Sequence, residues 1–134
     1  MLRRGFTALA LSLLALPVVS TAHAAGGPTA FITKWDADHD GTLDLAEIDK
    51  AADAMFAKLD TDHDGTLDLK ELGNRMTKAE FQAADKDHDG TLDKAEYESI
   101  VAQRFHAANT DGDSTIEAKE LTTAAGKRLL TLLQ

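Results

Sequence analysis

The sequence predicts an all-α domain in which short helices alternate with four acidic loops. One twelve-residue pattern rich in Asp occurs four times, and successive copies start 24 or 25 residues apart. The segments between the copies carry apolar residues at helical spacing. A chain of 134 residues is enough for one small domain. Because it contains no Cys, neither disulfides nor Cys-ligated metal can hold it together.

Residues 1–24 have the composition of an export signal. Arg3 and Arg4 form a basic start, an apolar run follows, and Ala22-His23-Ala24 places small residues where a signal peptidase cleaves. The run is shorter than the roughly 20 residues of a membrane span. We therefore expect a signal peptide, a mature domain over 25–134, a periplasmic or secreted location, and no membrane attachment after cleavage. The adjacent arginines leave both the general and the twin-arginine export routes open.

The chain is strongly acidic, and most of its acid lies in the repeats. Asp and Glu total 23 against 14 Lys and Arg, which gives a net charge of −9, and 19 of the acids fall inside the four copies. An acidic chain is a poor partner for nucleic acid or an anionic membrane. Crowded carboxylates repel one another unless a cation lies among them. The composition therefore predicts cation sites.

The spacing within the repeats indicates which cation they bind. The copies cover residues 36–47, 60–71, 85–96 and 109–120, and the first three share Asp-x-Asp-His-Asp-Gly-Thr-Leu-Asp-x-x-Glu. Glycine at position 6 permits a sharp turn with positive φ, so the carboxylates at positions 1, 3 and 5 can converge. A backbone carbonyl at position 7 and the glutamate at position 12 add further oxygens. A site built from oxygen ligands at positions 1, 3, 5, 7 and 12 favours Ca²⁺, and Mg²⁺ is the weaker candidate.

The copies resemble the calcium loop of the EF-hand family over residues 36–120. The resemblance implies an EF-hand array of four helix-loop-helix sites for up to four Ca²⁺, similar to small secreted or periplasmic EF-hand (calmodulin-like) proteins of bacteria. The aspartates at position 9 are expected to reach the ion through water and to cap the next helix. The implied ligands are Asp36, Asp38, Asp40, Thr42, Glu47, Asp60, Asp62, Asp64, Thr66, Glu71, Asp85, Asp87, Asp89, Thr91, Glu96, Asn109, Asp111, Asp113, Thr115 and Glu120.

The fourth copy departs from the pattern at two positions. Asn109 replaces Asp at position 1 and so removes one charge. Ser114 replaces Gly at position 6, which should cost about 1 kcal/mol or more if that residue is left-handed. Glu117 stands at position 9. We expect this loop to be the weakest calcium site, and we expect Ser114→Gly to tighten it.

The segments between the loops are predicted to be helical, with one interruption. Gly73-Asn74 weakens a helix between the second and third loops, and Thr77-x-x-Glu80 is typical of a new helix start, so a break is expected near 73–77. A single last helix is expected after the fourth loop. The apolar positions are Phe31, Ile32 and Trp35, then Ala51, Ala52, Met55, Phe56 and Leu59, then Leu72, Met76 and Phe81, then Tyr97, Ile100, Val101, Phe105 and Ala108, and finally Leu121, Ala124, Ala125, Leu129 and Leu132.

The short spacing between loops constrains which of them can be neighbours. Only about 12 residues separate Glu47 from Asp60, so one shared helix must leave the first loop and enter the second, spanning about 18 Å. Two loops at the ends of a straight helix cannot lie side by side. We therefore predict that loop 1 neighbours loop 3 and that loop 2 neighbours loop 4. The contacts would use the apolar residues at position 8, which are Leu43, Leu67, Leu92 and Ile116.

Three further features have a structural and a functional interpretation. His39, His63 and His88 stand at position 4, where a left-handed, solvent-facing backbone explains them better than metal binding or pH sensing. Met55 and Met76 fit a core better than a target groove. The leucine-rich run over 129–133 either completes the core or docks a partner.

Two classes of function remain for such a chain. The first is a calcium buffer or sensor, and the alternative is a structural or partner-binding module that needs permanently bound calcium to fold. An enzyme is not expected, because the chain has no Cys and no nucleophile motif, and its clustered carboxylates are accounted for as ligands.

Overall fold

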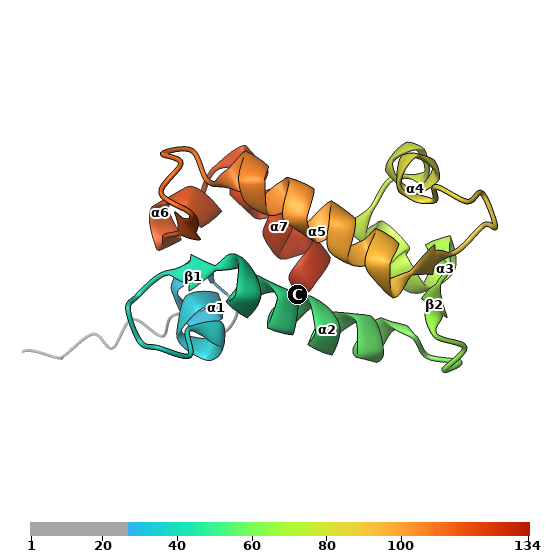
Figure 1. Cartoon of the computed structure of the whole chain (residues 1–134), viewed down its shortest axis with the longest axis horizontal. Coiled ribbons are helices and arrows are strands. Elements are labelled where there is room, and N and C mark those ends of the chain that lie inside the picture. Colours follow the sequence, from blue (N-terminus) through green and yellow to red (C-terminus); the bar gives the residue numbers. More distant parts are fainter. Residues whose placement is uncertain (1–26) are drawn as a thin grey trace, which may run out of the picture.

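The computed structural model describes residues 27–134, which form an elongated, mostly helical domain (Figure 1). The predicted signal peptide over 1–24 lies outside the described residues. Within them, no helix combines the length and the apolar composition that crossing a membrane requires. The helices and strands, in chain order, are α1 (Pro28–Trp35), β1 (Leu43–Asp44), α2 (Leu45–Leu59), β2 (Thr66–Leu67), α3 (Leu69–Leu72), the 3₁₀ turn η1 (Gly73–Arg75), α4 (Lys78–Ala84), β3 (Leu92–Asp93), α5 (Lys94–Ala108), β4 (Thr115–Ile116), α6 (Ala118–Leu121) and α7 (Ala124–Leu133).

The two long helices α2 and α5 run along the molecule and are each shared by two loops (Figure 1). Helix α2 leaves loop 1 and enters loop 2, and α5 leaves loop 3 and enters loop 4. This confirms the prediction of shared helices and the exclusion of a contact between loops 1 and 2. The four strands are only two residues long each, so they serve as contacts between loops rather than as a sheet layer.

The predicted pairing of the loops was wrong. Strand β1 of loop 1 pairs antiparallel with β4 of loop 4, with Leu43 opposite Ile116. Strand β2 of loop 2 pairs with β3 of loop 3, with Leu67 opposite Leu92. The reason is that the chain reverses between α3 and α4, which leaves loop 3 at the same end as loop 2. Helix α5 then returns along α2 and brings loop 4 beside loop 1.

This reversal occurs at the predicted break between loops 2 and 3. Helix α3 ends at Gly73, whose φ is 55°, a conformation that glycine adopts with little strain. Thr77 then begins α4, because its side chain accepts a hydrogen bond from the Glu80 amide while the Glu80 carboxylate accepts one from the Thr77 amide. The three apolar residues predicted to be buried here, Leu72, Met76 and Phe81, are buried.

The single last helix expected after loop 4 is in fact two helices. Between α6 and α7, the Thr123 hydroxyl accepts a hydrogen bond from the Gly126 amide at 3.0 Å and donates one to the Glu120 carbonyl at 2.6 Å. Gly126 lies so close to this turn that a Cβ there would collide with the Glu120 carbonyl oxygen. The threonine cap and the missing side chain together let α7 fold back along the molecule.

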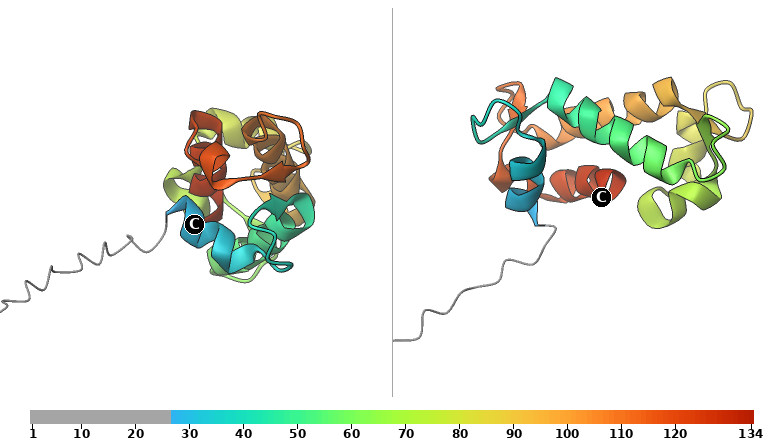
Figure 2. Two further views of the ribbon diagram at one scale, coloured as in Figure 1. Left: turned by 90° about the vertical axis from the view of Figure 1, so that its left-hand side faces the viewer. Right: turned by 90° about the horizontal axis from the view of Figure 1, so that it is seen from below.

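Helix α7 completes the core between α2 and α5 (Figure 2). Four leucines of the C-terminal run are buried, so this run belongs to the core. Tyr97 on α5 is fully buried and donates its hydroxyl to the Leu132 carbonyl at 2.9 Å, while its ring packs edge-on against Phe56. Met55 and Met76 are also buried, which confirms them as core residues.

Candidate metal sites

Each of the four loops is fixed at both ends by the caps of its flanking helices. In loop 1, Asp36 at position 1 is the C-cap of α1, and Asp44 at position 9 is the N-cap of α2. The Asp44 side chain accepts from the Glu47 amide, and the Glu47 carboxylate accepts in return from the Asp44 amide. Helix capping therefore places the carboxylates of positions 1 and 12 before any ion is considered.

Further hydrogen bonds turn the carboxylates of loop 1 toward its interior. The Asp36 carboxylate accepts from the amides of Asp40 at 3.2 Å and Gly41 at 2.9 Å. The Glu47 carboxylate accepts from the Ala37 amide at 2.6 Å, across the open side of the loop. Loops 2 and 3 repeat all three contacts. The repeated sequence therefore folds into three copies of one cage.

Each loop brings together a group of three carboxylates. In every group, one oxygen from each side chain lies within 4.8 Å of the others. Calcium holds oxygens at 2.3–2.6 Å, so two ligands on opposite sides of one ion are roughly 5 Å apart. The spacing therefore fits one calcium ion per loop. The groups are Asp36 with Asp38 and Asp40, Asp60 with Asp62 and Glu71, Asp85 with Asp87 and Glu96, and Asp111 with Asp113 and Glu117.

The groups include only part of the predicted ligand set. Glu47 and Glu120 lie outside them, as do Asp64 and Asp89. In loop 4 the position-9 residue Glu117 joins the group. Coordination by the twenty ligands named from sequence stays a prediction.

The acids of loops 1–3 are crowded and lack side-chain cations. Among residues 27–134, no salt bridge involves an acid of these loops. Six of the seven acids at positions 1 and 12 are nevertheless buried, namely Asp36, Glu47, Asp60, Asp85, Glu96 and Glu120, whereas Glu71 is half-buried. Burying a carboxylate without a nearby positive charge destabilises the folded state. A cation bound in each of these loops would offset this cost.

The pKa values of the position-3 acids show this repulsion. The backbone amide of Asp40 lowers the pKa of Asp38, but burial and the negative charges of Asp40 and Glu47 outweigh it, so the pKa ends above its usual value. The pKa values of Asp62 and Asp87 are raised by the same balance of effects. A cation in the loop would remove the cause of these shifts.

Loop 4 keeps the backbone of the other loops but not their charge. Ser114 has φ 76°, close to the φ of 85° at Gly41, so the expectation that position 6 is left-handed is confirmed. Sequence reasoning missed a further difference, which is that the Lys119 ammonium contacts Glu117 at 2.9 Å and Asp111 at 3.5 Å. The lysine at this position was not a sufficient signal, because within the described residues Lys70 at the same position of loop 2 forms no salt bridge.

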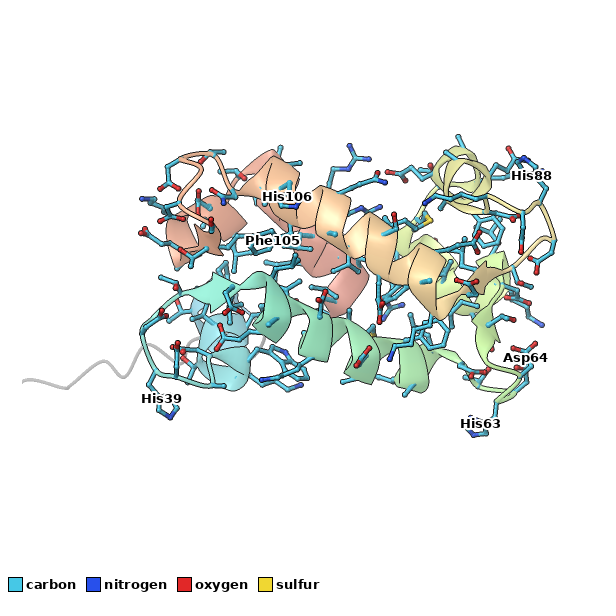
Figure 3. All side chains as sticks on the ribbon, in the orientation of Figure 1. His39, His63, Asp64, His88, Phe105 and His106 are labelled. Atoms are coloured by element: carbon cyan, nitrogen blue, oxygen red, sulfur yellow. The ribbon has the colours of Figure 1, made fainter. Side chains whose placement is uncertain are left out.

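The histidines at position 4 have the conformation expected of them. His39, His63 and His88 have φ of 59–61° and are exposed. Figure 3 shows His39 and His63 at the outer tips of their loops, pointing away from the helices. Gly112 stands at the same position of loop 4 with φ 73°. A left-handed backbone facing solvent therefore accounts for the residue type at this position.

Comparison with known families agrees with the geometry. A family model described as an EF hand domain matches residues 51–79, which contain loop 2, and a second EF hand model matches residues 77–102, which contain loop 3. Residues 51–102 therefore match EF-hand models, which supports an EF-hand calcium-binding family for this part of the chain. No curated protein matches the chain. Its similarity to small bacterial members stays a prediction.

Proposed function

We propose that this protein is an exported calcium-binding protein that binds Ca²⁺ at all four loops and acts as a calcium buffer or sensor. The observation that carries the proposal is that three carboxylates converge in each loop. Within the described residues, no side-chain cation forms a salt bridge with the acids of loops 1–3. EF-hand families are typically calcium-binding regulators, so we propose binding rather than catalysis.

Hydrogen bonds within the chain position the carboxylates of each site. Backbone amides orient the carboxylates at positions 1 and 12, and the capping residues at position 9 hold the start of the next helix. Calcium would supply the positive charge that offsets the repulsion among the acids. Because α2 and α5 each join two loops, a change at one end of the molecule would be passed to the other as a shift of a whole helix.

A second candidate is a structural module that needs permanent calcium to fold, and the buried carboxylates favour it. A ligand at 100 times its dissociation constant adds about 2.7 kcal/mol of stability per site. Four such sites would approach the 5–15 kcal/mol that is typical of a whole small domain. Calcium could therefore decide whether this acidic domain folds at all.

One titration distinguishes these functions. Calorimetric titration of residues 25–134 with Ca²⁺, in the presence of physiological Mg²⁺, would be combined with circular dichroism of the calcium-free protein. A helical calcium-free protein with a binding midpoint inside the ambient calcium range would indicate a buffer or sensor. A calcium-free protein that folds only on binding, well below ambient calcium, would indicate a structural role. Absence of binding would overturn the proposal.

Export is a separate part of the proposal and has its own test. It rests on the basic start, the apolar run and the small residues before position 25. Expression of the full chain in a Gram-negative host, followed by fractionation and mass determination, should give a processed protein in the periplasmic fraction. An unprocessed protein in the cytoplasmic fraction would contradict it.

A further inference from the structure

A groove of about 480 Å³ lies between α4, α5 and α7. It borders loop 3 through Lys86 and Glu96, but most of it is formed by helix faces outside the loops. Pockets for small organic ligands typically measure roughly 300–1,000 Å³ and are mostly apolar, with a few convergent polar groups. The apolar surface of this groove consists of Ala83, Ala84, Ile100, Ala107, Ala124 and Ala125.

Positively charged side chains also line this groove. Its lining contains the cations Lys86, Arg104 and Arg128 against the acids Glu80 and Glu96, so its charge is net positive, whereas the chain carries −9. The arrangement favours negatively charged ligands by charge complementarity.

The two arginines have different roles in this groove. The Arg104 side chain is only 11% exposed, and its guanidinium donates to the carbonyl of Arg128 and to the carboxylate of Glu80. Arg128 is 66% exposed, and among the described residues only its Nη2 atom is engaged, by Glu80. Glu80 is held in turn by the amide and hydroxyl of Thr77. Arg128 is therefore positioned by its neighbours, and its other guanidinium N–H groups have no acceptor within residues 27–134.

We propose that this groove binds a small amphipathic organic anion. The apolar body of the ligand would lie on the alanine-rich surface, and its carboxylate or sulfonate would accept hydrogen bonds from Arg128. Hydrogen bonds between charged groups are among the strongest in proteins, so this contact would distinguish a charged ligand from a neutral one of the same shape. The proposal does not depend on calcium binding, because neither Arg128 nor the alanines belong to a loop.

A matched pair of fluorescent probes tests the proposal. Anilinonaphthalene sulfonate and phenylnaphthylamine share one aromatic body, but only the first carries a sulfonate. We expect the purified protein to bind one sulfonate probe per chain, at least about tenfold more tightly than the neutral probe, which corresponds to one charged hydrogen bond. The titration is run with calcium chelated and again with calcium present, so that a failure of the calcium proposal is seen separately.

Three variants assign the binding to the groove. Arg128→Gln should weaken the sulfonate probe about tenfold and leave the neutral probe unchanged. Lys127→Gln removes the same charge from the neighbouring exposed residue, outside the groove, and should change neither probe. Ala107→Leu fills the groove from an exposed helical position and should weaken both probes. Equal effects of Arg128→Gln and Lys127→Gln, equal affinity for the two probes, or no effect of Ala107→Leu would overturn the proposal.

Discussion

Loops 1 and 4 lie side by side and share a strand pair, yet they satisfy their carboxylates in different ways. In loop 1, Asp36 accepts two backbone amides, and no side-chain cation contacts its acids within the described residues. In loop 4, Asn109 stands at the same position and, within residues 27–134, accepts only the Gly112 amide, while Lys119 contacts two acids. The shared backbone shape thus accommodates two different charge balances.

This difference shows that the backbone shape of a loop and the strength with which its negative charge attracts a cation have separate causes. The shape comes from local hydrogen bonds and from a left-handed residue at position 6, which serine adopts in loop 4 at some cost in strain. The attraction for a cation comes from the number of acids and from whether a lysine already lies among them. Loop 4 keeps the backbone shape but has lost part of the attraction for a cation.

The largest expected effect concerns the strand pairing. Glu47→Gln should weaken calcium binding in loop 1 about 100-fold, because losing one charge of a buried ionic contact costs roughly 3 kcal/mol. Loop 4 should weaken as well, because β1 pairs with β4. Glu71→Gln at the other end of the molecule serves as the control. The amide signals of Gly41 and Gly112 in calcium titrations followed by NMR report each loop, and equal effects of both variants on loop 4 would break the pairing argument.

The next effect tests strain at position 6. Ser114→Gly should raise the free energy of unfolding by about 1 kcal/mol and tighten loop 4, because glycine adopts positive φ without strain. Gly41→Ser should lower the free energy of unfolding by a similar amount. A Cβ at Gly41 would meet no atom of the described residues within 4 Å, so only the backbone conformation is affected. Urea unfolding at fixed calcium measures both variants, and changes of the same sign would count against the strain.

A smaller effect is expected from the lysine of loop 4. Lys119→Gln should tighten calcium binding in that loop by a few-fold at low salt, since an exposed ion pair is worth about 0.2–1 kcal/mol. Lys70 stands at the same position of loop 2 and forms no salt bridge in the part of the chain that the structure describes, so Lys70→Gln controls for the loss of net charge. Calorimetry at low and high salt would measure both, and an equal gain in the two variants would show that Lys119 has no specific role.

The smallest effects should appear in the pH dependence of stability without calcium. The pKa of Asp38 is raised in the folded chain, which means that its negative charge destabilises the fold. Asp38→Asn should therefore raise the free energy of unfolding at neutral pH. This increase should disappear as the pH falls through the pKa of Asp38 in the folded chain. Hydrogen bonds from the amide and hydroxyl of Thr115 lower the pKa of Asp113. Asp113→Asn should therefore destabilise the chain at neutral pH, and the difference should fade as the pH falls. Unfolding in chelator over a pH series would show whether the two signs are opposite.

Local features of the fold were predictable because neighbouring residues cause them. The break near Gly73 follows from a glycine and a capping box, and the left-handed backbone at His39 and Ser114 follows from the repeat. The split between α6 and α7 was missed. It depends on the Thr123 cap and on the close approach of Gly126 to Glu120, which no apolar periodicity reveals.

The four loops, their acidic character and the helices between them follow from the order of the residues, because hydrogen bonds and charges within a few residues fix each of these. The meeting of loop 1 with loop 4, the place of α7 in the core and the position of Arg128 at a groove follow from long-range packing. These contacts join residues far apart in the chain. They depend on the direction in which the chain leaves the turn at Gly73 and on how α2, α5 and α7 bury their apolar faces together.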